Sequence, residues 1–208
     1  TGRGLGPSAP YGPSRRLRDE LWHARKEPLV GVFTDFDSDA MWAAASIIGR
    51  EKYKNLPVQA RVGAARAFQD ANVPWEHVTG RDLKAGLAGR YKVVYLPAIL
   101  ALDQGLLEIL SQYVRDGGRL VIDAPTGWLD EYGRLLNTEE GTLFERTFGC
   151  VMRDFQYSRN VPRQFRGQEL TGFVLDLQTT AARAVEAYDD ARPAVTEHRL
   201  GEGTAVVL

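Results

Sequence analysis

Residues 91–123 read YKVVYLPAILALDQGLLEILSQYVRDGGRLVID, and this stretch decides the fold class. Its first part, 91–98, is rich in Val and Tyr and ends at a proline, which predicts a buried strand. Apolar side chains recur on one face of residues 103–116, where Asp103 can cap a helix and two glycines can stop it. The apolar run 119–123 follows at once as another strand. Strand, helix and strand with short links predict parallel strands with helices packed on them.

The same alternation extends toward the N-terminus. An apolar run at 29–36 predicts a buried strand, and good helix formers follow it at 39–48. Residues 57–72 predict a clearer helix, because a proline opens it and alanines recur at helical spacing. WEHVT at 75–79 predicts an edge strand, and 81–89 a short helix or turn. We therefore expect an α/β fold in which helices flank a mostly parallel sheet.

The C-terminal part of the chain changes character. Residues 143–149 predict one short helix. Four short apolar segments then follow with little helix between them, at 173–177, 184–188, 194–200 and 204–208. Such a succession of strands predicts an antiparallel extension of the sheet.

The chain opens on a segment of different composition. Three prolines and four glycines fall within residues 1–13, which predicts an arm or linker. With the short charged helix expected after it, this segment covers residues 1–28, and the α/β domain covers 29–208. An arm of this kind, and an end within an apolar strand, are typical of a domain cut from a longer polypeptide.

Composition excludes several classes of partner. The chain has 26 basic and 27 acidic residues and a formal net charge of −1, which argues against nucleic acid or an anionic membrane as a partner. No window approaches the ~20 apolar residues of a membrane span. With one cysteine, Cys150, the chain forms no intrachain disulfide and no cysteine-based metal site. The compartment stays open, with the cytoplasm slightly favoured.

An acidic stretch, DFDSD, follows the first strand. It places Asp35, Asp37 and Asp39 at alternate positions, a spacing that can bind a hard cation. The EF-hand pattern fails, because Ala40 stands where it needs Gly and Ser46 where it needs Glu. The plainer interpretation is an acidic loop that caps the following helix.

The turn after the strand 119–123 is where hydrolases of this architecture carry a nucleophile. The turn reads DAPTG, with no Ser or Cys, and Thr126 is its only hydroxyl. Neither a dinucleotide fingerprint nor a P-loop is present. We therefore expect no catalytic residue, no metal and no cofactor in this domain. Two alternatives stay open: a free-standing metal-assisted hydrolase that uses Asp35, Asp37 and Asp123, and a small-molecule binding module that uses the crevice at the strand ends.

Basic and aromatic residues alternate between 153 and 166, with Phe155 and Arg159 as candidates for contact. We interpret the segment as a loop-rich interface. An anionic or sugar ligand, bound by stacking and hydrogen bonds, is the alternative interpretation.

Several of these segments resemble one known family, the β-galactosidase trimerisation domain, a class I glutamine amidotransferase-like module of microbial glycoside hydrolases. The resemblance lies in VGVFTDFDSDAMW at 30–42, in 91–123 with its Y-V-x-x-G-G junction, and in PTGWLDEYGRL at 125–135. FERTFGCVM at 144–152 and the closing GEGTAVVL extend it. The fold that it implies is flavodoxin-like or amidotransferase-like, with added C-terminal strands.

This resemblance also implies a function. The domain would be a non-catalytic, oligomerising part of a β-galactosidase-like hydrolase, often a trimer, whose two catalytic carboxylates belong to a separate barrel domain. That barrel needs ~200 residues or more, which this chain does not supply. Carbohydrate is a possible further partner. Trp42 and Trp128 are candidate interface residues at strand ends, and for Trp42 a buried packing role is the alternative.

Overall fold

The structure is a computed structural model that describes residues 27–46, 55–157, 160 and 162–208. The predicted arm, residues 1–28, therefore lies outside the described residues except for its last two positions. That arm and the domain bounds stay predictions. None of the described helices combines the length and the apolar character that crossing a membrane requires.

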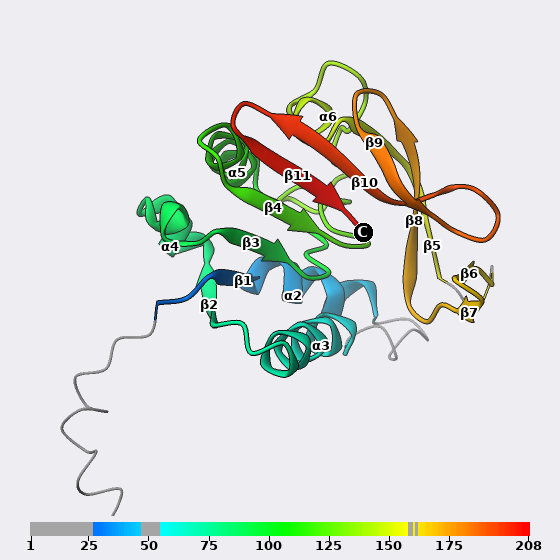
Figure 1. The fold of residues 1–208 in the computed structure, drawn as a ribbon, viewed down its shortest axis with the longest axis horizontal. Helices are drawn as coiled ribbons and strands as arrows, with labels where there is room; N and C mark the ends of the chain where they lie inside the picture. Colours follow the sequence, from blue (N-terminus) through cyan, green and yellow to red (C-terminus); the bar gives the residue numbers. More distant parts are fainter. Residues whose placement is uncertain (1–26, 47–54, 158–159, 161) are drawn as a thin grey trace, which may run out of the picture.

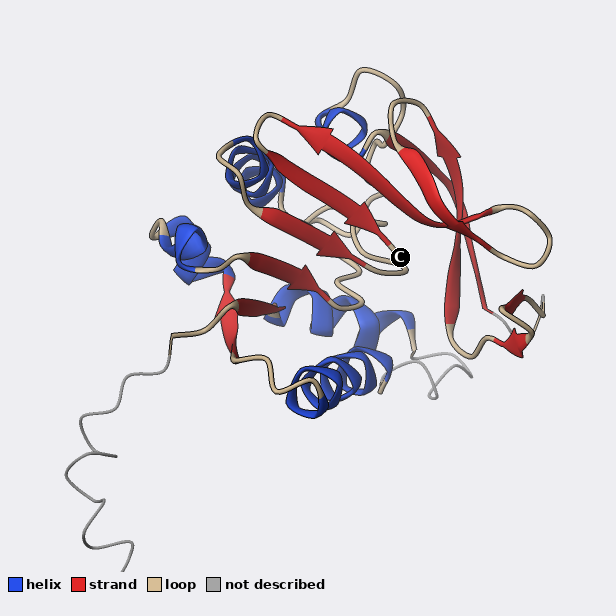
Figure 2. Ribbon diagram, in the orientation of Figure 1, coloured by secondary structure: helices blue, strands red, loops and turns tan. Residues whose placement is uncertain are grey.

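One seven-stranded sheet organises the molecule (Figures 1 and 2). Its strands lie in the order β2 (Trp75–Thr79), β1 (Val30–Thr34), β3 (Val93–Leu96), β4 (Arg119–Ile122), β11 (Gly203–Val207), β10 (Pro193–Leu200) and β9 (Arg183–Ala187). The first five of these run parallel, and β10 and β9 are each antiparallel to their neighbour. The predicted mostly parallel sheet is confirmed, and WEHVT is the edge strand.

The antiparallel extension was predicted only in part. Strands β10 and β9 form it, but β11 is parallel to β4 and lies between β4 and β10. The segment Phe173–Thr179, β8, leaves the main sheet and pairs with β5, Cys150–Tyr157. That pairing corrects the prediction of a loop-rich segment from 153, because the described residues up to 157 are a strand with a bulge after Met152. Two short strands, β6 (Gln164–Phe165) and β7 (Gln168–Glu169), form a further small hairpin.

The helices begin where side chains can cap them. They are α2 (Phe36–Ala45), α3 (Leu56–Asp70), α4 (Gly80–Lys84), the 3-10 helix η2 (Leu87–Arg90), α5 (Gln104–Arg115) and α6 (Leu143–Phe148). Helix α2 starts three residues earlier than predicted, because Asp35 accepts a hydrogen bond from the Ser38 amide and caps it. Asp103 caps α5 in the same way, as predicted.

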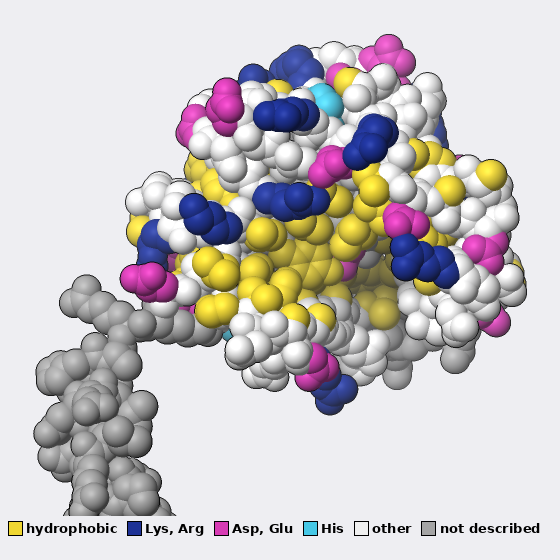
Figure 3. Space-filling model, in the orientation of Figure 1, with side chains coloured by type: hydrophobic (Ala, Val, Ile, Leu, Met, Phe, Trp, Pro, Cys, Tyr) yellow, Lys and Arg dark blue, Asp and Glu magenta, His cyan; other side chains and the backbone are white. Residues whose placement is uncertain are grey.

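Helices cover the two faces of the sheet unequally (Figure 1). The main core lies on the face that carries α4, α5, α6 and the β5–β8 pair, and it includes Cys150 as a small buried side chain. On the other face, α3 packs Ala64 and Phe68 against β1 and β3. Among the described residues, no helix continues this second layer over β4, β11 and β10, and Figure 3 shows hydrophobic side chains gathered there.

A close backbone approach places β11 in the sheet. Glu202 and Thr204 donate backbone hydrogen bonds to the carbonyls of Arg115 and Gly118, at the junction between α5 and β4. Between them lies Gly203, where an added Cβ would stand 2.1 Å from the Val114 carbonyl oxygen. Only a residue without a side chain fits here, because the obstacle is backbone that cannot turn aside.

We predict that Gly203→Ala destabilises the domain by about 2–3 kcal/mol or more, because the methyl group forces β11 away from α5 and β4. The matched control is Gly63→Ala on α3, where nothing lies within 4 Å of the added Cβ. That control should gain up to ~1 kcal/mol from helix propensity. Urea unfolding of both variants measures the effect, and equal stability of the two would contradict the close approach.

Candidate functional site

The strand order reverses between β1 and β3, because β2 lies on one side of β1 and all later strands lie on the other. Ligands of open α/β sheets bind at the carboxyl ends of the strands near such a point. Two hollows are found at this edge. We call them the acidic crevice, which includes Asp35 and Asp37, and the aromatic cavity, which includes Asp123.

The acidic crevice has a volume of about 770 Å³. Its charged lining is Asp35, Asp37, Asp82, Asp103 and Glu131 against Arg81 and Lys84. Phe36 lines it as well, with 83% of its surface exposed. The crevice is therefore a negatively charged hollow with an exposed aromatic ring.

Asp35 has a structural task in this crevice. It caps α2 through the Ser38 amide at 2.9 Å, so the interpretation of a capping acidic loop is confirmed. Burial raises the pKa of Asp35, the Ser38 hydrogen bond lowers it in part, and nearby carboxylates such as Asp37 raise it further. Asp39 is paired with Arg61 through two hydrogen bonds of 2.8 and 2.9 Å.

The three aspartates of the hydrolase alternative do not share one hollow. Asp35 and Asp37 line the acidic crevice, whereas Asp123 lines the aromatic cavity. Within the described part of the chain, no three or more His, Cys, Asp or Glu side chains are grouped so that they could hold a metal ion.

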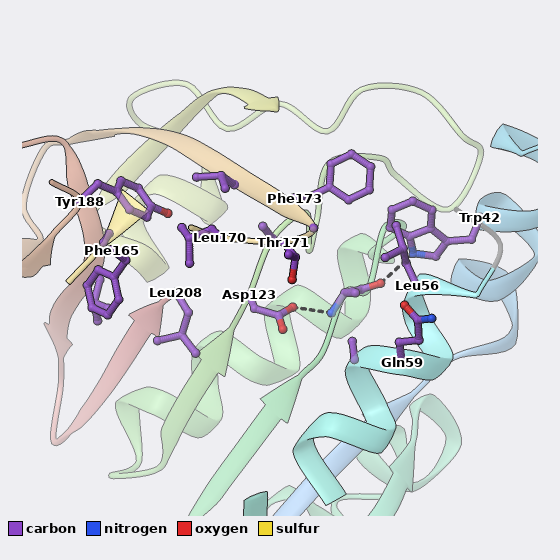
Figure 4. A pocket seen from close by; sticks show the side chains of 17 residues that line it. Trp42, Leu56, Gln59, Asp123, Phe165, Leu170, Thr171, Phe173, Tyr188 and Leu208 are labelled. Carbon is purple, nitrogen blue, oxygen red and sulfur yellow. Dashed lines mark hydrogen bonds between the residues drawn. The ribbon is translucent and has the colours of Figure 1, made fainter. Parts of the chain in front are cut away.

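The aromatic cavity has a volume of about 480 Å³ and is shown in Figure 4. Trp42, Phe165, Phe173 and Tyr188 contribute rings to its wall, and Asp123 contributes a half-buried carboxylate. Burial raises the pKa of Asp123 to about 6, although hydrogen bonds from the Tyr95 hydroxyl and the Ala98 amide lower it in part.

Ala98, just after β3, is held between two side chains. Its φ of 50° is in the left-handed region, which residues with a Cβ rarely adopt. The Ala98 amide donates to Asp123, and its carbonyl accepts a hydrogen bond of 2.9 Å from the Trp42 indole. Trp42 is only 2% exposed, so the packing alternative predicted for it is what the structure shows. Nothing in the residues around position 98 signals this conformation.

The other aromatic candidates meet in one cluster. Trp128 is half-buried and contacts Phe155 edge to face, with ring centroids 4.7 Å apart. Phe155 lies 5.0 Å from Phe173, and Phe173 lies 5.5 Å from Trp42. The structure thus joins Trp42, Trp128 and Phe155 through Phe173, which the sequence marked only as the start of a strand. Arg159 lies outside the described residues.

Thr126 and Cys150 carry the two groups that could act as a nucleophile in this part of the domain, and both are buried. The Thr126 hydroxyl donates to the Leu96 carbonyl at 2.9 Å and accepts from the Ile99 amide at 3.1 Å, and Thr126 is fully buried. Cys150 is also fully buried, and burial raises the pKa of its thiol to about 12. In this arrangement Thr126 is a structural link between β3 and the turn after β4.

Together, the mostly parallel sheet, its added C-terminal strands and the turn after β4, in which Thr126 has a structural role, define an α/β domain of the amidotransferase-like class. The chain belongs to the β-galactosidase trimerisation domain family, whose model matches residues 36–208. The predicted resemblance is therefore confirmed.

Solved structures share the fold. A catalytic mutant of Gan42B, a GH42 β-galactosidase from G. stearothermophilus, is 19% identical with a TM-score of 0.73, over 95% of this chain and 29% of its own. A β-galactosidase from the haloarchaeon Halorubrum lacusprofundi is 22% identical with a TM-score of 0.68, over 97% and 31%. The exo-β-1,4-mannosidase Op5Man5 from Opitutaceae bacterium strain TAV5 is 15% identical with a TM-score of 0.60, over 93% and 33%.

This chain therefore spans about a third or less of the length of these structures. No curated protein sequence matches the chain. At these identities the structural likeness shows the fold.

We predict that Asp123 makes stability depend on pH. Its folded-state pKa of about 6 is above its ordinary value of 3.8, so the folded state holds an extra proton between these values. Asp123 therefore makes its whole contribution to the free energy of unfolding below pH 4. This contribution is lost as the pH rises through 6. Relative to the wild type, Asp123→Asn should gain about 2–3 kcal/mol between pH 4 and pH 7.

Urea unfolding at both pH values measures this difference. Tyr95→Phe is the matched control, because it removes a hydrogen bond that lowers the Asp123 pKa and should steepen the dependence. Parallel pH profiles for the wild type and Asp123→Asn would show that Asp123 titrates normally.

Proposed function

We propose that these 208 residues are the self-associating, non-catalytic module of a larger β-galactosidase-like glycoside hydrolase, and that the module forms trimers. The catalytic barrel lies in the parent chain outside this sequence. There, an acid and a nucleophilic carboxylate cleave the glycosidic bond.

Membership of the trimerisation domain family over residues 36–208 is the observation that carries this proposal. The short span of this chain against its structural relatives supports it, because 208 residues of this fold leave no room for a barrel. The occupied hydroxyl of Thr126 and the buried thiol of Cys150 support a non-catalytic role.

Sedimentation equilibrium of the chain tests self-association. We expect a species of three times the 23.1 kDa chain mass that dissociates on dilution. We also expect no hydrolysis of chromogenic galactosides by this chain alone. A monomer at every concentration would contradict the proposal, and Mg²⁺-dependent turnover that disappears in Asp35→Asn would favour the hydrolase alternative.

We also propose carbohydrate as a ligand of the aromatic cavity. The supporting observation is that rings of Phe165, Phe173 and Tyr188 line the same cavity as the Asp123 carboxylate. Rings and carboxylates are suited to the apolar faces and hydroxyl groups of sugars.

We expect lactose to raise the melting temperature of the chain more than an equal concentration of sucrose does. Sucrose is the control because any excluded sugar stabilises folded proteins. The lactose-specific part should be lost in Asp123→Asn. Equal shifts with both sugars would rule out the cavity as a lactose site.

A further inference from the structure

The half of the sheet beyond α3 presents apolar side chains that the described residues leave uncovered. We call this surface the open sheet face. It consists of β4, β11, β10 and β9 on the side opposite to α5. Its exposed and half-buried side chains include Arg119, Val121, Arg183, Val185, Glu186, Val195, Glu197 and Arg199. Val185 is 46% exposed. Its strands β4 and β11 are parallel, and parallel strands are ordinarily covered on both faces, so this surface is suited to a partner.

Arginines make the open sheet face positive. Glu197 is shared by Arg119 and Arg183, each at 3.2 Å, and Arg199 is exposed on the same side of β10. Glu186 lies opposite Val195 on the same face, so three arginines against two glutamates leave a net charge of +1. The Arg119 and Arg183 side chains are 52% and 75% exposed, so both keep donors free for a partner's carboxylates.

A second surface of the same chain has the opposite charge. We call it the acidic aromatic patch: the acidic crevice with its exposed Phe36, together with the exposed Tyr132 and Leu135 of the loop that follows Glu131. These three are 83%, 72% and 69% exposed. The loop of Tyr132 and Leu135 packs on α2, where Met41 lies 3.3 Å from the place of a Cβ at Gly133. Five acidic residues and two basic residues in the crevice give a net charge of −3.

Neither surface complements itself. A two-fold dimer would place the open sheet face against its own arginines, or the patch against its own carboxylates. A ring of three copies needs instead two different surfaces that fit each other, one from each neighbour. This chain has two such surfaces. Each carries exposed apolar side chains, and their charged side chains are of opposite sign.

We infer that the open sheet face of one copy binds the acidic aromatic patch of a second copy, so that copies join head to tail. Arg119, Arg183 and Arg199 then face Asp35, Asp37 and Glu131 of the neighbour, and Phe36 covers the valines of the sheet. This inference rests on the proposed function and names the surfaces that carry it out.

Charge reversal on the full chain tests the pairing. Arg119→Glu and Asp37→Arg should each weaken the trimer at least tenfold in sedimentation equilibrium, and the chain that carries both changes should recover most of the loss. Only a direct attraction between the two surfaces predicts that recovery. Arg66→Glu, an exposed charge on α3 outside both surfaces, should leave the trimer unchanged.

Melting temperatures check that the variants fold. If a reversed charge unfolds the chain, Phe36→Gln and Val185→Gln replace it, because both side chains are exposed and their loss should weaken association without loss of stability. A wild-type trimer that none of these changes weakens would overturn the inference and leave the proposed function standing. In that case the rest of the parent chain, or other surfaces, would be the partner. A wild-type monomer would overturn both.

Discussion

The backbone of Ala98 is the point at which α2, β3 and β4 are tied together. Its left-handed conformation is unfavourable for a residue with a Cβ, and two side chains from separate elements hold it there. Trp42, bound to its carbonyl, also contacts Phe173 and so leads to the β5–β8 pair. Asp123, bound to its amide, fixes the turn that contains Thr126. The aromatic cavity exists because these contacts converge at one strand end.

This arrangement gives several polar groups at the carboxyl edge of the sheet a structural role. In an open α/β sheet, a reactive group at this edge needs an accessible side chain and a base beside it. Here the hydroxyl of Thr126 is used by backbone groups on both sides, and Asp35 caps a helix. The polar groups at this edge have structural tasks, and the features left over are an aromatic cavity, an acidic crevice and an uncovered sheet face. Those features are suited to binding.

Much of the fold is predictable because its signals are local. Apolar runs mark β3 and β4, and Asp103 with the glycines after α5 marks both ends of that helix. Strand β5 was missed because its second half alternates charged and aromatic residues, which also occurs in loops. The place of β11 depends on a fit to α5 that no local pattern contains. At the site, the capping role of Asp35 follows from its position, whereas Ala98 and Phe173 acquire their roles only through contacts with residues distant in the sequence, such as Trp42.

The position of β11 also determines when the domain can fold during synthesis. Strands β1 to β4 are complete by residue 122, yet their neighbour on the β10 side is the segment Gly203–Val207. Before that segment leaves the ribosome, β4 has an unpaired edge and the core lacks Ala205 and Val207. The sheet therefore becomes continuous from β4 to β10 only after about 80 further residues have been made. Until then the open sheet face is also incomplete, because β11 joins its β4 part to its β10 part.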